Sequence, residues 1–200
     1  MNVAFKWRWW LAAILAAQLL RSGSVLAQNG KFSEYQVKAA FLYNFGKFVE
    51  WPTNDFASTT APLVIGIYGD NPFGNNLAEV IQGRNINGHP VVTREVSLDN
   101  LKSCQILFIA RSRQKEISEI RKTLDGAGIL TVTENIDDSF ESGVMINFIL
   151  KDDRIRFEIN NTAAEKVGLK LSSKLLILAT KTTMIQKIGT PLSFLCARYP

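Results

Sequence analysis

The chain has 200 residues, of which 46% are hydrophobic and 20% are charged, and it contains two cysteines. This composition excludes intrinsic disorder, collagen-like repetition and a disulfide-rich miniprotein, and the length fits one compact domain. The formal net charge is +5, from 23 Lys and Arg against 18 Asp and Glu. Such a charge would suit a polyanionic partner, so the position of the basic residues matters.

Residues 1–27 have the layout of a secretory signal peptide. Lys6 and Arg8 form a cationic start, residues 9–20 are predominantly apolar, and a small-residue site ends at Ala27. The apolar run is shorter than the roughly 20 residues that cross a bilayer core. We therefore expect cleavage after Ala27 and export, rather than a retained anchor, and no membrane insertion of the mature chain.

Cleavage would remove three of the 23 basic residues, Lys6, Arg8 and Arg21, and none of the acidic ones. The 173 residues that follow Ala27 then carry 20 basic and 18 acidic side chains, a net charge of +2. A nearly neutral domain without a run of basic residues lacks the electrostatic footprint of a nucleic-acid-binding protein. No nucleic-acid partner is expected.

The mature chain opens with a predicted amphipathic helix. Ser33 and Gln36 fit a capping box, in which each side chain bonds the backbone N–H of the other residue. Apolar residues then recur at helical spacing until Trp51-Pro52, at positions Val37, Phe41, Phe45 and Phe48. The pattern favours a helix that packs its aromatic face on the core over one that exposes that face to a partner.

From residue 63 onward, short β-branched runs alternate with helical patterns. We predict strands over 63–68, 90–96, 105–110 and 129–133, and helices over 73–82 and 112–124. This βαβ rhythm is typical of a parallel sheet whose crossover helices cover both faces.

The second half of the chain has a different pattern. Residues 143–150 and 154–159 predict a β-hairpin, and short helices follow it, one from Asn160 to Gly168 and one from Ser172 to Leu178. The expected fold class is therefore α/β: a single domain with a mixed, mostly parallel sheet, helices on both faces, and a C-terminal β-hairpin followed by short helices.

We expect the domain to span residues 28–179 and a C-terminal extension to span 180–200. The extension is rich in apolar residues, which indicates that it packs on the domain or at an interface. It also contains Cys196. An intramolecular disulfide would have to join Cys196 to Cys104, and the alternative is that Cys104 is simply a small buried apolar residue.

Residues with catalytic chemistry are scarce. His89 is the one histidine of the chain, it lies in a predicted turn, and no nucleophile motif accompanies it. We expect no catalytic residue, no metal site and no cofactor. Asp70, Asn71 and Arg111 follow predicted strands, and they would converge on a ligand crevice if those strands are neighbours. A plain strand-to-helix turn is the alternative explanation for them.

Three ordered motifs resemble the YfiR family of bacterial periplasmic proteins. They are VKAAFLYNF followed by KFVEWP (residues 37–52), GVMINF (143–148), and RFEIN (156–160) leading to GLKLSSKLL (168–176). The resemblance covers residues 34 to about 179. The strand CQILFI at 104–109 also resembles the central strand of that family. Members of the family often pair a cysteine of this strand with one in the first strand, which here has none.

The resemblance implies a non-enzymatic repressor that acts in the periplasm as a homodimer. Such a repressor binds the periplasmic part of a membrane-bound diguanylate cyclase or sensor protein, and it thereby lowers cyclic-di-GMP signalling and biofilm formation. Within the motifs, Arg156 and Lys174 are the side chains we expect to be exposed for partner binding. The alternative function is a periplasmic small-molecule-binding sensor that uses the crevice at Asp70, Asn71 and Arg111.

Overall fold

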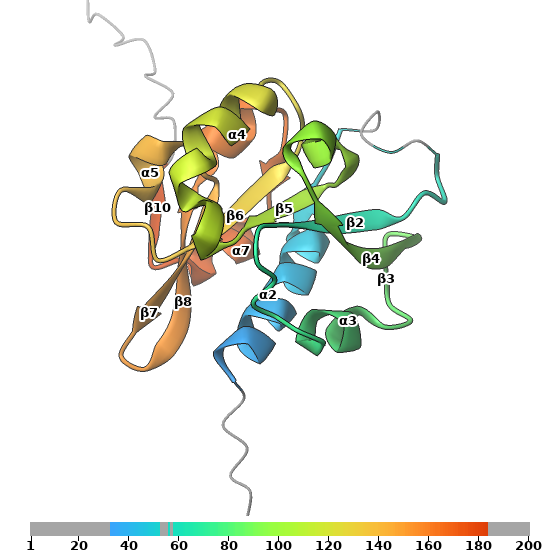
Figure 1. Cartoon of the computed structure of the whole chain (residues 1–200), viewed down its shortest axis with the longest axis horizontal. Helices are drawn as coiled ribbons and strands as arrows, with labels where there is room; N and C mark the ends of the chain where they lie inside the picture. Colours follow the sequence, from blue (N-terminus) through green and yellow to red (C-terminus); the bar gives the residue numbers. More distant parts are fainter. Residues whose placement is uncertain (1–32, 53–55, 57, 184–200) are drawn as a thin grey trace, which may run out of the picture. The chain divides into compact units, whose positions relative to one another are not determined.

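A mixed sheet is the centre of the structure, a computed structural model that describes residues 33–52, 56 and 58–183 (Figure 1). Within these residues the sheet has eight strands in the order β10-β8-β7-β6-β5-β2-β4-β3. Their bounds are β2 (Leu63–Tyr68), β3 (Asn85–Ile86), β4 (His89–Val96), β5 (Ile106–Ile109), β6 (Leu130–Glu134), β7 (Ile146–Lys151), β8 (Arg154–Asn160) and β10 (Lys181–Thr183). The predicted signal peptide lies outside the described residues.

Most neighbouring strands of this sheet run parallel. β2 pairs in parallel with both β4 and β5, β5 with β6, β6 with β7, and β10 with β8. The antiparallel pairs are β3 with β4 and β7 with β8. The predicted α/β fold with a mixed, mostly parallel sheet is confirmed. A separate two-stranded sheet pairs β1 (Val49–Glu50) with β9 (Lys170–Leu171).

A tight turn joins β7 to β8. Asp152 and Asp153 both have positive φ, at 52° and 54°, and Lys151 pairs with Arg154 across the turn. Aspartate tolerates this left-handed backbone better than most residues do, and two such residues in sequence suit the two-residue turns that match strand twist. The Asp-Asp pair is thus explained by the backbone.

Helices cover both faces of the sheet. Successive strand residues point to opposite sides, and in β2 and β5 both sides carry apolar side chains that the helices bury. On one face, Ile65 and Ile106 pack with side chains of α2 (Glu34–Phe48), α3 (Asn76–Ile81), α6 (Asn161–Lys166) and α7 (Ser173–Leu178). On the other face, Val64 and Leu107 pack with α4 (Ile117–Thr123) and the 3-10 helix η2 (Leu98–Ser103). Figure 1 shows α4 on one side of the sheet and α2 with α3 on the other.

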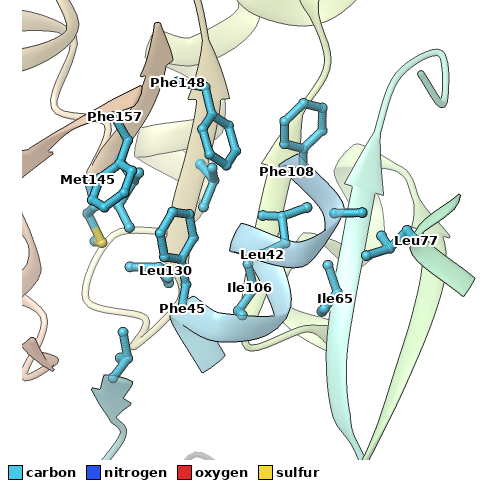
Figure 2. Close-up of a cluster of buried hydrophobic side chains, with 14 of the residues drawn as sticks. Leu42, Phe45, Ile65, Leu77, Ile106, Phe108, Leu130, Met145, Phe148 and Phe157 are labelled. Atoms are coloured by element: carbon cyan, nitrogen blue, oxygen red, sulfur yellow. The ribbon is translucent and has the colours of Figure 1, made fainter. Parts of the chain in front are cut away.

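Helix α2 contributes Ala39, Leu42 and Phe45 to the core on the first of these faces. Phe45 is fully buried, stacks on Phe148 at a ring distance of 5.6 Å and meets Phe157 edge to face at 5.2 Å (Figure 2). Phe41 packs against the same rings while half-buried. The buried face is centred on Leu42 and Phe45, so the helix packs on the core as predicted and contributes little apolar surface to the outside.

Three predicted helix starts agree with the structure. At Ser33 both bonds of the capping box are present, with Gln36 N–H donating to Ser33 Oγ at 3.2 Å. Asn160 caps α6 by accepting from the N–H of Ala163 at 3.0 Å. Ser172 caps α7 by accepting from the N–H of Leu175 at 3.3 Å. These caps satisfy N–H groups that the helices themselves leave free.

Two predicted helices were wrong in extent. The helix expected over 112–124 is a 3-10 helix, η3 (Arg111–Glu116), followed by α4. None of the η3 residues is buried, so no packing holds that segment in α-helical form before Ile117. The helix expected from Phe73 starts only at Asn76, because Gly74 adopts a left-handed φ of 52°.

The sheet also includes part of the segment that we assigned to the C-terminal extension. β10 lies beside β8, with Lys181 paired to Glu158 and Thr183 paired to Asn160. Thr180 adds a hydrogen bond from its N–H to the carbonyl oxygen of Phe157 at 2.9 Å. The remainder of the extension, residues 184–200, lies outside the described residues.

Candidate functional site

The carboxyl ends of β2 and β5 lie side by side, as the predicted ligand crevice requires. β2 has β4 on one side and β5 on the other, so the crossover direction reverses between β2 and β5, the usual place for a ligand in such sheets. Asp70 and Asn71 follow β2, Arg111 follows β5, and all three are exposed.

The loops at this point are tied to each other. The N–H of Asp70 donates to Ser112 Oγ at 3.1 Å, and Asn71 Oδ1 accepts from the N–H of Phe73 at 2.9 Å. A Cβ added at Gly69 would lie 2.7 Å from Cγ of Arg113, so the two loops are in contact there. Asn71 therefore shapes its own turn, and a ligand role for Asp70, Asn71 and Arg111 stays a prediction.

Tyr68, Arg113 and Glu116 form a polar cluster below these loops. The Tyr68 hydroxyl donates to Glu116, and Arg113 forms an ion pair with Glu116 at 2.8 Å. Burial, with the hydrogen bond to Glu116 as the next cause, raises the pKa of Tyr68 to about 12. The bonds from Tyr68 and Arg113 lower the pKa of the Glu116 carboxyl. Neutral Tyr68, at the carboxyl end of β2, and ionised Glu116, at the end of η3, therefore hold each other in place.

A second charged cluster lies where α2 passes over the end of β6. Lys38 and Glu134 are each 1% exposed and form an ion pair, and Lys38 also pairs with Glu34 one helical turn earlier. The Tyr35 hydroxyl donates to Glu134 at 3.2 Å, and the Lys38 ammonium lies 4.7 Å from the centre of the Tyr35 ring. Each charge has partners within the chain, so this cluster anchors α2 to the sheet.

The contacts of His89 link parts of the fold to each other. It is half-buried, its Nδ1 is 2.6 Å from the carbonyl oxygen of Ala61, and its ring stacks on Phe56 at 4.0 Å. These contacts connect the start of β4 to the segment that precedes β2. In the described part of the chain, no group of three or more His, Cys, Asp or Glu side chains is placed to hold a metal ion.

Cys104 is a buried free thiol at the start of the β5 segment. It is 2% exposed, its Sγ donates to the carbonyl oxygen of Leu101 at 3.2 Å, and burial raises its pKa to about 12. The first-strand residue that faces it is Gly66, where an added Cβ would lie 2.8 Å from Cys104 Sγ. Cys196, its predicted disulfide partner, lies outside the described residues.

The exposed apolar surface of the second half is concentrated on α7. Ile177 is 81% exposed and Leu178 is 60% exposed, and both lie on the same short helix as the exposed Lys174. Leu175 of α7 points the other way, into the core. Lys174 is exposed as expected, and together these three side chains form what we call the α7 surface: Lys174, Ile177 and Leu178.

Sequence reasoning selected Lys174 but missed Ile177 and Leu178. The signal was present in the segment Ser-Lys-Leu-Leu-Ile-Leu, because four consecutive apolar residues in a helix cannot all face one core. Arg156 is also exposed, but it alternates with the buried Phe157 on β8 and so points to the face opposite α7. The structure therefore does not bring Arg156 and Lys174 together.

The polar residues of the second and third motifs have structural partners. Asn147 donates to the carbonyl oxygen of Ile136 at 2.9 Å, and Glu158 accepts from the hydroxyl of Ser139 at 2.9 Å. Asn160 donates to the carbonyl oxygen of Phe140 at 3.1 Å. All three bonds hold the segment around α5 (Ser139–Ser142) against β7 and β8. These motif positions are explained by the fold.

Within the described residues, no helix has both the length and the apolar character needed to cross a membrane. The sequence matches the family model described as DUF4154, YfiR/HmsC-like, over residues 35–180. No curated protein matches the chain.

Two solved structures resemble this one. The first is a conserved domain protein from Vibrio cholerae O1 biovar El Tor, with a TM-score of 0.50 and 13% identity, covering 76% of this chain and 61% of that chain. The second is an ABC domain in complex with L-Trp from Streptococcus pneumonia, with a TM-score of 0.41 and 12% identity, covering 60% of this chain and 55% of that chain. At these identities the Vibrio likeness supports the fold alone, and this chain spans less than two thirds of either structure.

Proposed function

Because the chain belongs to the YfiR/HmsC-like family, we propose that it is an exported, non-enzymatic regulator of cyclic-di-GMP signalling. In this proposal the domain acts in the periplasm, where it binds the periplasmic part of an inner-membrane diguanylate cyclase or sensor protein and holds that protein inactive. Family membership over residues 35–180 is the observation that carries the proposal, since the match spans nearly the whole described domain.

The α7 surface is our candidate for the partner contact. Ile177 and Leu178 expose most of their side chains, and complete burial of such a residue is worth about 1.5–3 kcal/mol. Lys174 on the same helix adds a charge that would favour an acidic residue of the partner. A partner surface with an apolar centre and a carboxylate beside it fits these three side chains.

Arg156 provides a second exposed position on the opposite face of the sheet. We assign it to a separate contact, because one flat partner surface cannot reach both faces. In a homodimer, one of the two faces would hold the second copy and the other would hold the membrane protein.

The test is a deletion strain complemented with variants. Deletion should raise cellular cyclic-di-GMP, and the wild-type chain should restore the low level. The double variant Ile177→Ser, Leu178→Ser should be exported and folded but fail to restore it. Leu150→Ser is the matched control, because Leu150 is also an exposed large apolar residue, at 57%, but lies on β7.

A purified mature chain should also retain the periplasmic part of a membrane cyclase in a pull-down, and the α7 double variant should retain much less of it. An unchanged cyclic-di-GMP level after deletion, together with no membrane protein that co-purifies, would overturn the proposal. Equal loss of repression in the Leu150→Ser control would instead reject α7 as the contact.

A further inference from the structure

An apolar groove opens between α4 and the amino ends of β6 and β7. It encloses about 620 Å³, a volume in the range of pockets that take up small molecules or side chains. Its floor consists of side chains that are all less than 9% exposed: Ile117 and Ile120 of α4, Leu124 at the C-cap of that helix, Ile129, Val144 and Met145. The groove lies at the amino ends of β6 and β7, with α4 from one face of the sheet and α6 from the other at its margins, and no residue of α7 lines it.

The edges of the groove are formed by α4 on one side and α6 on the other. Lys122 and Asp125 lie at the end of α4, and Ala163, Lys166 and Val167 belong to α6 and its C-cap. Arg121 crosses toward Ser142, with its Nη1 3.4 Å from the Ser142 carbonyl oxygen. The opening is thus an apolar slot with charged side chains at its margin, a form suited to a segment of chain with alternating apolar residues.

We propose that the C-terminal segment, residues 184–200, is the occupant of this groove, within the same chain. The proposal is independent of the regulatory function. The family match ends at residue 180, so the segment is an addition to the family domain.

The first argument is the point at which the described chain ends. Thr183, the last residue of β10, donates from Oγ1 to Asn160 Oδ1 at 3.0 Å. Asn160 is the N-cap of α6, and its Oδ1 also accepts from the N–H of Ala163, a groove residue, at 3.0 Å. The segment therefore starts within one helical turn of the groove margin. Lys181 is fixed nearby, with its ammonium 4.6 Å from the centre of the Phe140 ring.

The second argument is the composition and length of the segment. Its 17 residues include seven apolar or sulfur-containing positions that need cover from water: Met184, Ile185, Ile188, Leu192, Phe194, Leu195 and Cys196. Cys196 lies thirteen positions after Thr183 in the sequence, and an extended chain of that length reaches up to about 45 Å. The segment can therefore both enter the groove and run along it.

Site-directed disulfide trapping tests the proposal, because the segment carries its own reporter, Cys196. Lys122→Cys and Lys166→Cys place a thiol on either margin of the groove, where both lysines are exposed. Glu79→Cys, at an exposed position of α3, a helix that does not line the groove, is the control. Cys104 can remain in place, since it is buried and its raised pKa keeps it protonated.

Under mild oxidation of the purified full-length mature protein, at least one groove variant should form an intramolecular bond to Cys196 several-fold faster than the control. Peptide mass spectrometry without reduction identifies the bond. Equal rates at Glu79→Cys and at the groove positions would overturn the proposal. Disulfide-linked dimers through Lys122→Cys or Lys166→Cys would show that a second copy supplies the segment, which also overturns it.

Removal of residues 184–200 provides a second readout that needs no new cysteine. The truncated protein should bind the dye ANS several-fold more strongly than the full-length protein, because the groove floor becomes open to solvent. It should also unfold at a lower temperature. Unchanged dye binding and an unchanged unfolding temperature would mean that the groove is free in the full-length protein and available to a small molecule, contrary to the proposal.

Discussion

Lys38 is a charged residue in the second turn of the core-facing helix α2, and it is buried. Its partner Glu134 is 96 residues away in the sequence and equally buried. Two charges withdrawn from water gain little net stability from their attraction, but either one left alone is strongly unfavourable. Helix α2 therefore has to pack on β6 in the position that brings Lys38 and Glu134 together.

We predict that Lys38→Ala lowers the free energy of unfolding by about 3–5 kcal/mol, because it leaves Glu134 buried without a cation. The double variant Lys38→Met, Glu134→Leu should recover most of that loss, since neither charge then remains. Urea denaturation followed by circular dichroism measures both. Lys47→Ala, at an exposed position of the same helix, should change stability by less than about 0.5 kcal/mol. A double variant no more stable than Lys38→Ala would contradict this account.

Tyr35 makes the same cluster sensitive to alkaline pH. Burial, followed by the negative charge of Glu134, raises its pKa from 10.0 to about 12. Between these two values the folded protein keeps a proton that the unfolded chain has lost, so this contribution to stability is complete below pH 10 and falls as the pH approaches 12.

Tyr35→Phe should therefore lose less stability than the wild type between pH 10 and pH 12. It should also remove the phenolate absorbance change of one tyrosine from the upper end of the titration of the folded protein. Urea denaturation at several alkaline pH values and a spectrophotometric titration are the two measurements. An alkaline titration of the variant that matches the wild type in amplitude and midpoint would show that Tyr35 is not the group concerned.

At the scale of elements, Asn160 joins three of them. Its side chain caps α6, donates to the carbonyl oxygen of Phe140 in α5 and accepts from Thr183 of β10. Ser172, in contrast, has one such bond, to the N–H of Leu175 at the start of α7. A comparison of Asn160 with Ser172 therefore separates the stability contributed by a helix cap from that contributed by the additional bonds to α5 and β10.

We predict that Ser172→Ala costs about 1 kcal/mol of stability, the usual value for a helix cap. Asn160→Ala should cost about 2–4 kcal/mol, because it also frees the other two groups. Urea denaturation of both variants gives the comparison. Equal losses would mean that the bonds to Phe140 and Thr183 contribute nothing beyond the cap.

The sequence predicts these elements well where the signal is local. The caps at Ser33, Asn160 and Ser172 involve residues three positions apart, and each was correctly assigned. The first part of the helix predicted over 112–124 was wrong, because a polar segment takes its conformation from the surroundings rather than from its own pattern. The two-residue strands β1 and β9 could not be predicted, since each exists only through pairing with the other.

At the scale of the whole molecule, the fold class followed from the alternation of strands and helices. The predicted ligand crevice required β2 and β5 to be neighbours, and they are paired in the sheet. The candidate site was harder to predict from the sequence. Exposure of Arg156 and Lys174 was predicted, but their placement on opposite faces depends on strand alternation and on the packing of Leu175. The burial of Lys38 depends on Glu134, which no local pattern connects to it.

The pairing of β10 with β8 has a consequence for solubility. β10 covers β8 only from Glu158 to Asn160, and no strand of the described residues pairs with the outer edge between Arg154 and Arg156. An open strand edge is a template on which a second chain can add a strand and begin to aggregate. The two arginines place positive charge on that edge, and identical copies repel each other there. Arg156 therefore discourages aggregation.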